Sequence, residues 1–453
     1  MTRLALTVND IADSGAGIAC IEEDGRPVRV FVPGALPGDR VAAELLPRPK
    51  GSHSLTARVT GFIERSPYRR ETPFCPHFDR CGGCPLAGIT REAQLALKRR
   101  RLLALFEGIL PAEAVAPVIG LRDGEIPRRN KALLHFAGRP GALALGLYAQ
   151  GSHDVLPETL SCPQCPDWME AAARAVLSLG GSLWLDAWDE QRGKGMLRAL
   201  LLRDAGEGGR LAALVCGREP DAAFRDALAA ALKAAGVTAA CAFVNAEPGN
   251  APLRGRSLAI LGDGTAAANI GGLTFRVRPE TFLQVNPVQT PRLYEAALRM
   301  AGLSPEADVL DLYCGVGTLT LLAARRSRRA LGVEIVPASI AQAKENARLN
   351  GIDNAGFLCG PAEALMPEIA ASGFAPEAVI VDPPRKGLEE SVPAAIASLG
   401  PERIVYIACG PAALARDCRR FAALGYRAVR LQPVDLFPET QHVEAVCLLE
   451  RAG

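Results

Sequence analysis

From about Pro279 to the C-terminus, strand-like and helix-like segments alternate along the chain. Short apolar runs typical of buried strands occur at residues 308–311, 329–334, 378–382 and 403–407. Parallel neighbouring strands need a long crossover, usually a helix, so this alternation predicts a largely parallel sheet with helices on both faces. We therefore expect an α/β, doubly wound, Rossmann-like domain over residues 271–453, with its active site at the carboxyl ends of the strands.

The first 270 residues predict two further domains. Residues 1–62 consist of short apolar or alternating runs separated by turn signals such as Asp24-Gly25 and Pro37-Gly38, which is the pattern of a small β-barrel. Residues 63–270 mix strand and helix patterns and predict a central α+β domain. An amphipathic helix predicted over residues 90–110 is a candidate to pack on the C-terminal domain.

Composition favours a cytoplasmic protein over the secreted and membrane-spanning classes. With 453 residues, 49% of them apolar and 22% charged, the chain is long enough for about three folded domains. It has no run of about 20 apolar residues and no apolar signal near Met1, so we expect a cytoplasmic protein with no membrane partner. Its 13 cysteines then favour metal binding or catalysis over disulfides.

A glycine turn follows the first strand of the predicted C-terminal domain. Gly315 and Gly317 let the backbone approach a ligand closely, and the next helix offers free N–H groups. Glu334, at the end of the next strand, is placed to accept hydrogen bonds from a ribose. Both NAD and S-adenosylmethionine fit, but Thr320 stands where a dinucleotide site has its third glycine, so the pattern favours S-adenosylmethionine.

Cys409 is a candidate nucleophile. It lies two residues after the strand-like run at 403–407, with Ala408 between them. A thiolate that adds to C6 of uracil makes C5 nucleophilic enough to take a methyl group. The C5 proton must then leave, and Glu444 is the predicted general base, with His442 as the rival. Asp382, stiffened by the two prolines that follow it, is expected to orient the base or the cofactor.

A second cluster of cysteines has the spacing Cys75-x5-Cys81-x2-Cys84, with further cysteines downstream. Thiolates are the ligands that iron–sulfur clusters and zinc prefer, and the spacing does not separate these two possibilities. A three-cysteine radical enzyme is a weaker interpretation, because its usual spacing differs.

Together these motifs resemble the RNA 5-methyluridine methyltransferases, most closely the bacterial 23S ribosomal RNA members, over nearly the whole chain. Residues 31–39 look like part of a TRAM domain, a small RNA-binding barrel. The resemblance implies a [4Fe-4S] cluster on Cys75, Cys81, Cys84 and Cys162, with Cys165 a competitor for the fourth position. It also implies Cys409 as nucleophile, Glu444 as base, and cofactor contacts at Gln284, Tyr313, Thr318, Glu334 and Asp382.

The chain departs from the family pattern at three positions. Gly410 replaces a frequent asparagine after the nucleophile, Thr318 replaces a commoner asparagine in the glycine loop, and Pro361 stands where a polar residue often contacts the adenine. None of these departures removes a group that the chemistry needs.

The resemblance implies an RNA substrate, and 23S ribosomal RNA is the expected one, with transfer RNA as the alternative and a monomer as the expected state. Basic runs at residues 98–101, 128–131 and 325–329 are candidate contacts to phosphates, the second run first. An amino-methyltransferase also uses an aspartate-proline-proline strand end, but it has an aromatic residue where this chain has Arg385. A non-catalytic RNA-binding protein would not need Cys409 and Glu444 together with the glycine loop.

Overall fold

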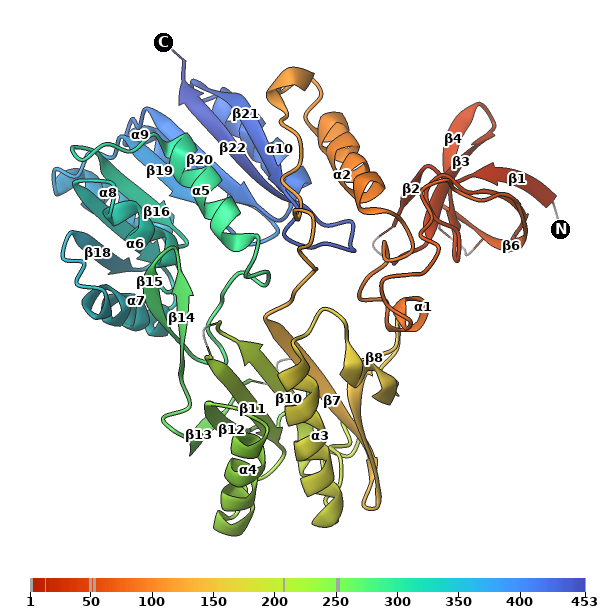
Figure 1. The fold of residues 1–453 in the computed structure, drawn as a ribbon. Helices are drawn as coiled ribbons and strands as arrows, with labels where there is room; N and C mark the ends of the chain where they lie inside the picture. The colour runs from red at the N-terminus through yellow and green to blue at the C-terminus, as the bar shows by residue number, and fades with distance from the viewer. Residues whose placement is uncertain are drawn as a thin grey trace.

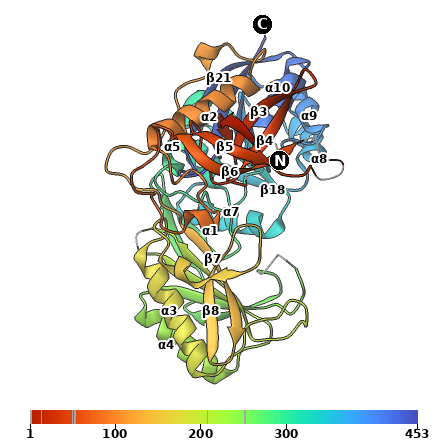
Figure 2. The ribbon, with the colours of Figure 1, turned by 90° about the vertical axis from the view of Figure 1, so that its right-hand side faces the viewer.

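The computed structural model describes residues 3–12, 14–48, 51, 54–206, 208–249 and 253–452. Three lobes are visible in Figure 1: an N-terminal lobe in red, a central lobe in yellow and green, and a C-terminal lobe in teal and blue. After a quarter turn, Figure 2 shows the N-terminal lobe in front of the C-terminal lobe, with the central lobe below both. Within the described ranges, no helix has the length and apolar character needed to cross a membrane.

The N-terminal lobe is a six-stranded sheet with the order β1-β5-β6-β4-β3-β2. Its small core is formed by short aliphatic side chains that alternate with exposed positions, among them Val30, Val32 and Val41, each fully buried. The strands are β1 Arg3–Thr7, β2 Asp10–Ile11, β3 Gly17–Glu23, β4 Arg26–Val32, β5 Arg40–Leu45 and β6 Leu55–Glu64.

The central lobe contains a seven-stranded sheet with the order β13-β12-β11-β10-β7-β8-β9. Strands β10 and β11 pair antiparallel. Its helices and strands are β7 Lys131–Arg139, β8 Ala142–Tyr148, β9 Val155–Leu156, α3 Asp167–Ser182, β10 Leu197–Asp204, β11 Arg210–Cys216, α4 Ala222–Ala234, β12 Ala239–Val244 and β13 Arg256–Leu261.

The helices α1 and α2 precede the central sheet. Helix α1, Phe78–Cys81, lies in the cysteine-rich loop, and α2, Arg91–Leu105, follows it. Thr90 caps α2, because its side-chain oxygen accepts a hydrogen bond from the Ala93 amide. Figure 1 shows α2 between the N-terminal and C-terminal lobes. Leu102 and Phe106 are fully buried in a core that they share with the C-terminal sheet.

The C-terminal lobe has the sheet order β18-β17-β16-β19-β20-β22-β21. Strands β16 to β20 are parallel, and β22 runs antiparallel between β20 and β21. The predicted mixed α/β architecture is therefore confirmed. The strands are β16 Asp308–Leu312, β17 Arg329–Glu334, β18 Ala355–Cys359, β19 Ala378–Val381, β20 Arg403–Ala408, β21 Tyr426–Val434 and β22 Glu444–Arg451, preceded by the hairpin β14 Ala266–Ile270 and β15 Leu273–Val277.

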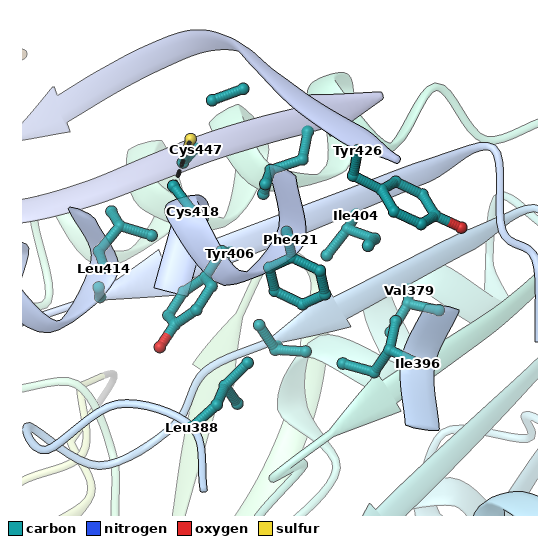
Figure 3. Packing of buried hydrophobic residues seen from close by; sticks show 14 of the residues in the cluster. Val379, Leu388, Ile396, Ile404, Tyr406, Leu414, Cys418, Phe421, Tyr426 and Cys447 are labelled. Carbon is teal, nitrogen blue, oxygen red and sulfur yellow. Dashed lines mark hydrogen bonds between the residues drawn. The ribbon is translucent and has the colours of Figure 1, made fainter. Parts of the chain in front are cut away.

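Helices cover this sheet on both faces. The helices α5 Thr290–Ala301, α6 Thr318–Ala324 and α7 Pro337–Leu349 contribute to one core, and α8 Ala362–Ala371, α9 Val392–Ser398 and α10 Pro411–Ala422 contribute to another. Figure 3 shows Tyr406 and Ile404 of β20 packed beside Phe421 and Leu414 of α10. Double coverage explains why the β20 residues from 404 to 407 are all apolar and fully buried. The strand order reverses between β16 and β19, which is where ligands bind in open α/β sheets.

Candidate active site

The glycine loop lies at the carboxyl end of β16, next to this reversal point. Its backbone takes positive φ angles at Tyr313 (66°), Gly315 (55°) and Gly317 (81°). A Cβ atom at Gly315 would meet no atom within 4 Å, so the loop faces open space there. A Cβ atom at Gly317 would lie 3.0 Å from Phe357, so that glycine allows close packing under α6.

Glu334, the last residue of β17, is fixed beside the glycine loop. Its Oε2 accepts a hydrogen bond from the Gly315 amide at 3.2 Å, and its Oε1 accepts one from the Val336 amide at 2.9 Å. The carboxylate therefore lies one strand away from β16, and two backbone amides set its orientation.

Asp382 follows β19 on the other side of the reversal point. Gln284 donates from Nε2 to Asp382 Oδ2 at 3.3 Å. Burial raises the pKa of the Asp382 carboxyl to about 7, and the hydrogen bond from Gln284 partly opposes this shift. Asn130 in turn holds the segment that carries Gln284. Its side-chain Nδ2 donates to the Gln284 carbonyl at 2.9 Å, and its backbone N–H donates to the Val285 carbonyl at 2.8 Å.

Cys409 comes directly after β20 and is partly exposed. Burial raises the pKa of its thiol, and the charges of Glu444 and Asp382 add to the increase, whereas Arg385 lowers it by its charge and by a hydrogen bond. Arg385 therefore favours the thiolate. A Cβ atom at Gly410 would lie 2.5 Å from the carbonyl oxygen of Arg385. The backbone segments therefore lie too close together here for the asparagine that is frequent at this position among RNA 5-methyluridine methyltransferases.

Glu444 is the first residue of β22 and only 3% exposed. Within the part of the chain that the structure describes, its Oε2 has no hydrogen-bond partner, which is unusual for a buried carboxylate oxygen. Burial and the nearby charge of Asp382 raise the pKa of Glu444 well above its usual value, and Arg385 opposes them. His442, the rival base, is partly exposed, and both its ring nitrogens lie 3.3 Å from the Arg385 guanidinium.

The cysteine cluster gathers around the loop that contains α1. The thiols of Cys162 and Cys81 contribute to raising the pKa of Cys75, although burial is the larger cause, and Cys162 and Cys75 affect Cys84 in the same way. Cys165 is adjacent as well, because its hydrogen bond lowers the pKa of Cys162. Among the described residues, no three His, Cys, Asp or Glu side chains are arranged to hold a metal ion.

Two of the three basic runs contain side chains that form ion pairs within the protein. In the first run, Lys98 is fully buried and forms an ion pair with Asp435, so its assignment as a phosphate contact was wrong. In the third run, Arg328 and Arg329 both pair with Asp308. The second run, residues 128–131, lies beside both the cysteine loop and the Gln284 segment.

Comparison with known proteins identifies the family. A sequence model described as tRNA (uracil-5-)-methyltransferase matches residues 268–452. An uncharacterized RNA methyltransferase of Halalkalibacterium halodurans is 36% identical over 449 residues, which cover 98% of this chain and 96% of that protein. The chain belongs to the RNA uracil-5 methyltransferase family. It is accordingly an RNA methyltransferase.

Two further proteins are similar to this chain over nearly its whole length. An uncharacterized RNA methyltransferase of Gloeobacter violaceus is 37% identical over 459 residues, covering 99% of this chain and 96% of that protein. The crystal structure of a Pyrococcus abyssi tRNA (uracil-54, C5)-methyltransferase in complex with S-adenosyl-L-homocysteine has a TM-score of 0.75. It is 22% identical in sequence, and the match covers 98% of this chain and 100% of that one, so the whole fold is similar.

Three side chains of this RNA uracil-5 methyltransferase were not predicted as part of the site. They are Arg385, which contacts Cys409, Asn130, which holds the Gln284 segment, and Tyr294 on α5, which hydrogen-bonds to Gln284. Arg385 had a visible signal, because it directly follows Asp382-Pro383-Pro384. Asn130 lies in a basic run that had been interpreted only as an RNA contact, and nothing in the sequence near Tyr294 indicates a role.

Proposed function

We propose that this protein methylates C5 of a uridine in RNA, with Cys409 as nucleophile and Glu444 as general base. One observation supports this most directly. A partly exposed thiol with a hydrogen bond from Arg385 lies within electrostatic range of a buried carboxylate whose Oε2 has no partner. A buried carboxylate oxygen without a partner is costly, so it is expected where function requires it.

The chemistry assigns a balanced set of bond changes to these residues. Cys409 adds its thiolate to C6 of the uracil, and the C5=C6 electron pair becomes available at C5, which takes a methyl group as a cation equivalent. Glu444 then removes the C5 proton. Its raised pKa makes it a stronger base than an ordinary carboxylate. The electron pair left at C5 restores the C5=C6 bond, and the Cys409 thiolate leaves.

S-Adenosylmethionine is the proposed methyl donor, since its sulfonium group supplies an electrophilic methyl. The residues around the reversal point fit such a ligand. Gly315 faces open space, the Glu334 carboxylate is oriented toward the loop, and Gln284 and Asp382 are hydrogen-bonded together on the opposite side. Tyr313, Gly317 and Thr318 complete the proposed cofactor contacts.

The proposed substrate is 23S ribosomal RNA, with the N-terminal lobe as a TRAM-like RNA-binding domain. The support is the resemblance and the position of the basic run at 128–131 next to the site. Transfer RNA is the second candidate, because the structurally similar Pyrococcus protein acts on it. Mapping 5-methyluridine in total RNA from a strain that lacks this protein distinguishes the two, since the modification disappears from one RNA only.

Covalent trapping tests the proposed mechanism. With S-adenosylmethionine present, the protein should form a stable covalent complex with RNA that contains 5-fluorouridine, because fluorine at C5 cannot be removed as a proton. Cys409→Ala should abolish the complex. Cys359→Ala is the matched control, since Cys359 is an exposed thiol in the same lobe, at the end of β18.

Glu444→Gln tests the base on unmodified RNA. This variant should form the adduct, transfer the methyl group and then release product at least about a hundredfold more slowly, the scale of general-base catalysis. The adduct should accumulate on denaturing gels. Normal turnover by this variant would assign the base to His442 or water, and trapping by Cys409→Ala would refute the nucleophile.

A [4Fe-4S] cluster is proposed on Cys75, Cys81 and Cys84, with Cys162 or Cys165 as the fourth ligand. The donor set suits iron–sulfur chemistry, and the thiols lie within electrostatic range of one another. Anaerobically purified protein should be brown and contain about four iron atoms per chain. A colourless protein with one zinc would refute the cluster, and Cys81→Ser, but not Cys20→Ser, should lose the metal.

A further inference from the structure

A cavity of about 420 Å³ lies between the central and C-terminal lobes, beside the proposed site. We call it the loop cavity. One wall is the cysteine loop, another is the start of β7, and the third is the loop before β22. Its lining residues are Gly82, Gly83, Pro85, Arg129, Lys131, Leu133, Val285, Phe437, Thr440, Gln441 and His442.

The loop cavity adjoins the reacting groups but contains none of them. His442 in its wall lies 3.3 Å from Arg385, which hydrogen-bonds to Cys409. Val285 in its floor directly follows Gln284, the partner of Asp382. Cys409, Glu444 and Asp382 themselves do not line it. A group bound in the loop cavity is therefore next to the methylated base and is not that base.

The charges in the loop cavity favour an anion. Arg129 and Lys131 line it, and no lining residue is acidic. Arg129 donates to the Gly83 carbonyl at 2.8 Å and to Gln164 at 3.1 Å, which fixes the guanidinium, and its charge also acts on the Cys84 thiol. Desolvation and the positive charge of Arg203 lower the pKa of Lys131. A phosphate would relieve that repulsion.

The remaining walls of the loop cavity suit a nucleobase. Phe437 and His442 lie edge to face, with ring centroids 6.0 Å apart and an interplanar angle of 76°. Leu133, Val285 and Pro85 add apolar surface. Aromatic and apolar side chains beside a fixed cation form the usual site for an unstacked base and its phosphate. The volume is within the range of small-ligand pockets.

We propose that the loop cavity binds a second nucleotide of the RNA, a near neighbour of the methylated uridine, with its base unstacked. This inference rests on the proposed function. Taking a uridine out of a folded RNA costs a few kcal/mol, and a binding site for a neighbouring base offsets part of that cost. The loop cavity then contributes to the choice of target, because it is filled only by an RNA in which a nucleotide near the methylated uridine can also leave its stack.

The test uses an oligoribonucleotide that spans the mapped uridine, present as 5-fluorouridine. Each of the three nucleotides on either side is replaced in turn by an abasic residue, and the rate of covalent trapping by the full chain is measured. One abasic position should lower the rate about tenfold or more, the effect of losing one stacked base. Leu133→Trp, which fills the cavity, should show the same loss with intact RNA and no further loss with that abasic RNA.

Two more variants complete the design. Lys131→Ala leaves the cavity open and should weaken trapping of intact RNA about tenfold at limiting RNA, with less effect at saturating RNA. Leu349→Trp, on the exposed end of α7, is the matched control and should trap at the wild-type rate. If Leu133→Trp fails to fold, Lys131→Ala still decides.

The inference is overturned if all six abasic RNAs are trapped at the wild-type rate. It is also overturned if Leu133→Trp or Lys131→Ala traps intact RNA at the wild-type rate. A third contradicting result would be a trapping rate of Leu133→Trp on the abasic RNA that is lower than its rate on intact RNA by the same factor as in the wild type. Failure of the wild type to trap intact 5-fluorouridine RNA at all would instead refute the proposed function, so the two failures are distinguishable.

Discussion

At the scale of single residues, the reactivity of Cys409 depends on three charged neighbours. Glu444 and Asp382 raise the pKa of the thiol in addition to burial, and Arg385 lowers it. Because only the thiolate attacks, Arg385 is the one of these three groups that favours the reactive form. It also opposes the shift at Glu444, so a single guanidinium stabilises the ionised forms of both Cys409 and Glu444, the proposed nucleophile and base.

Replacing Arg385 with methionine should therefore slow trapping in a pH-dependent way. The pKa of Cys409 rises further, and below that pKa the thiolate fraction falls tenfold for each unit of increase. We expect trapping of 5-fluorouridine RNA to be about tenfold slower at pH 7 and to approach the wild-type rate as the pH is raised. Lys386→Met is the control, since Lys386 is exposed and pairs with Glu389. A deficit equal at every pH would show that Arg385 acts only through binding.

The sequence patterns placed Cys409 and Asp382 at the ends of recognisable strands, as the structure has them, whereas Glu444 was named as the candidate base without a strand being predicted there. The sequence did not predict the role of Arg385, since residues 385 and 409 follow different strands and meet only because β19 and β20 are neighbours in the sheet. The lack of a hydrogen-bond partner for Glu444 Oε2 among the described residues could not be predicted either, because it depends on side chains from other segments.

At the scale of elements, the loop between β21 and β22 is held from outside its own lobe. Glu439 has a φ of 67° and is 2% exposed. Arg70 donates to both carboxylate oxygens of Glu439 at 3.0 Å. The side chain of Gln94, on α2, donates to the Glu439 carboxylate at 2.9 Å and accepts from the Glu439 backbone N–H at 3.0 Å. The Leu86 amide, in the cysteine loop, donates to its carbonyl at 2.9 Å. The positive φ is strained for glutamate, so these contacts must maintain it.

We expect Glu439→Gln to slow proton removal more than adduct formation. Glutamine keeps the shape but loses the charge that pairs with Arg70, and Glu444 lies only five residues further along the chain, at the start of β22. The turnover number on unmodified RNA should fall about tenfold with accumulation of the adduct, while trapping of 5-fluorouridine RNA stays within about twofold. Glu170→Gln, in an exposed ion pair on α3, is the control. Equal losses in both assays would mean that Glu439 serves the fold alone.

At the scale of the whole molecule, segments far apart in the sequence meet around one loop. Lys98 in α2 pairs with Asp435, and its Nζ donates to the Phe437 carbonyl at 3.0 Å. These contacts span more than 330 residues of chain. The order of strands and helices could be predicted from local patterns, but such contacts could not. A basic run such as residues 98–101 has the same composition whether it faces RNA or a buried carboxylate, which is why Lys98 was assigned wrongly.

Lys98→Met should destabilise the protein strongly, because Asp435 is then left buried and unpaired. Both side chains are at most 1% exposed. Removing one partner of a buried ion pair costs about 3 to 5 kcal/mol, whereas exchanging both partners for apolar groups is often neutral. Urea unfolding should therefore show a large loss for Lys98→Met and substantial recovery in Lys98→Met/Asp435→Leu. Arg174→Met, in an exposed pair, should change stability by less than about 1 kcal/mol. If Lys98→Met were as stable as the wild type, α2 would not anchor the loop through charge, and Glu439 and its partners would have to hold it alone.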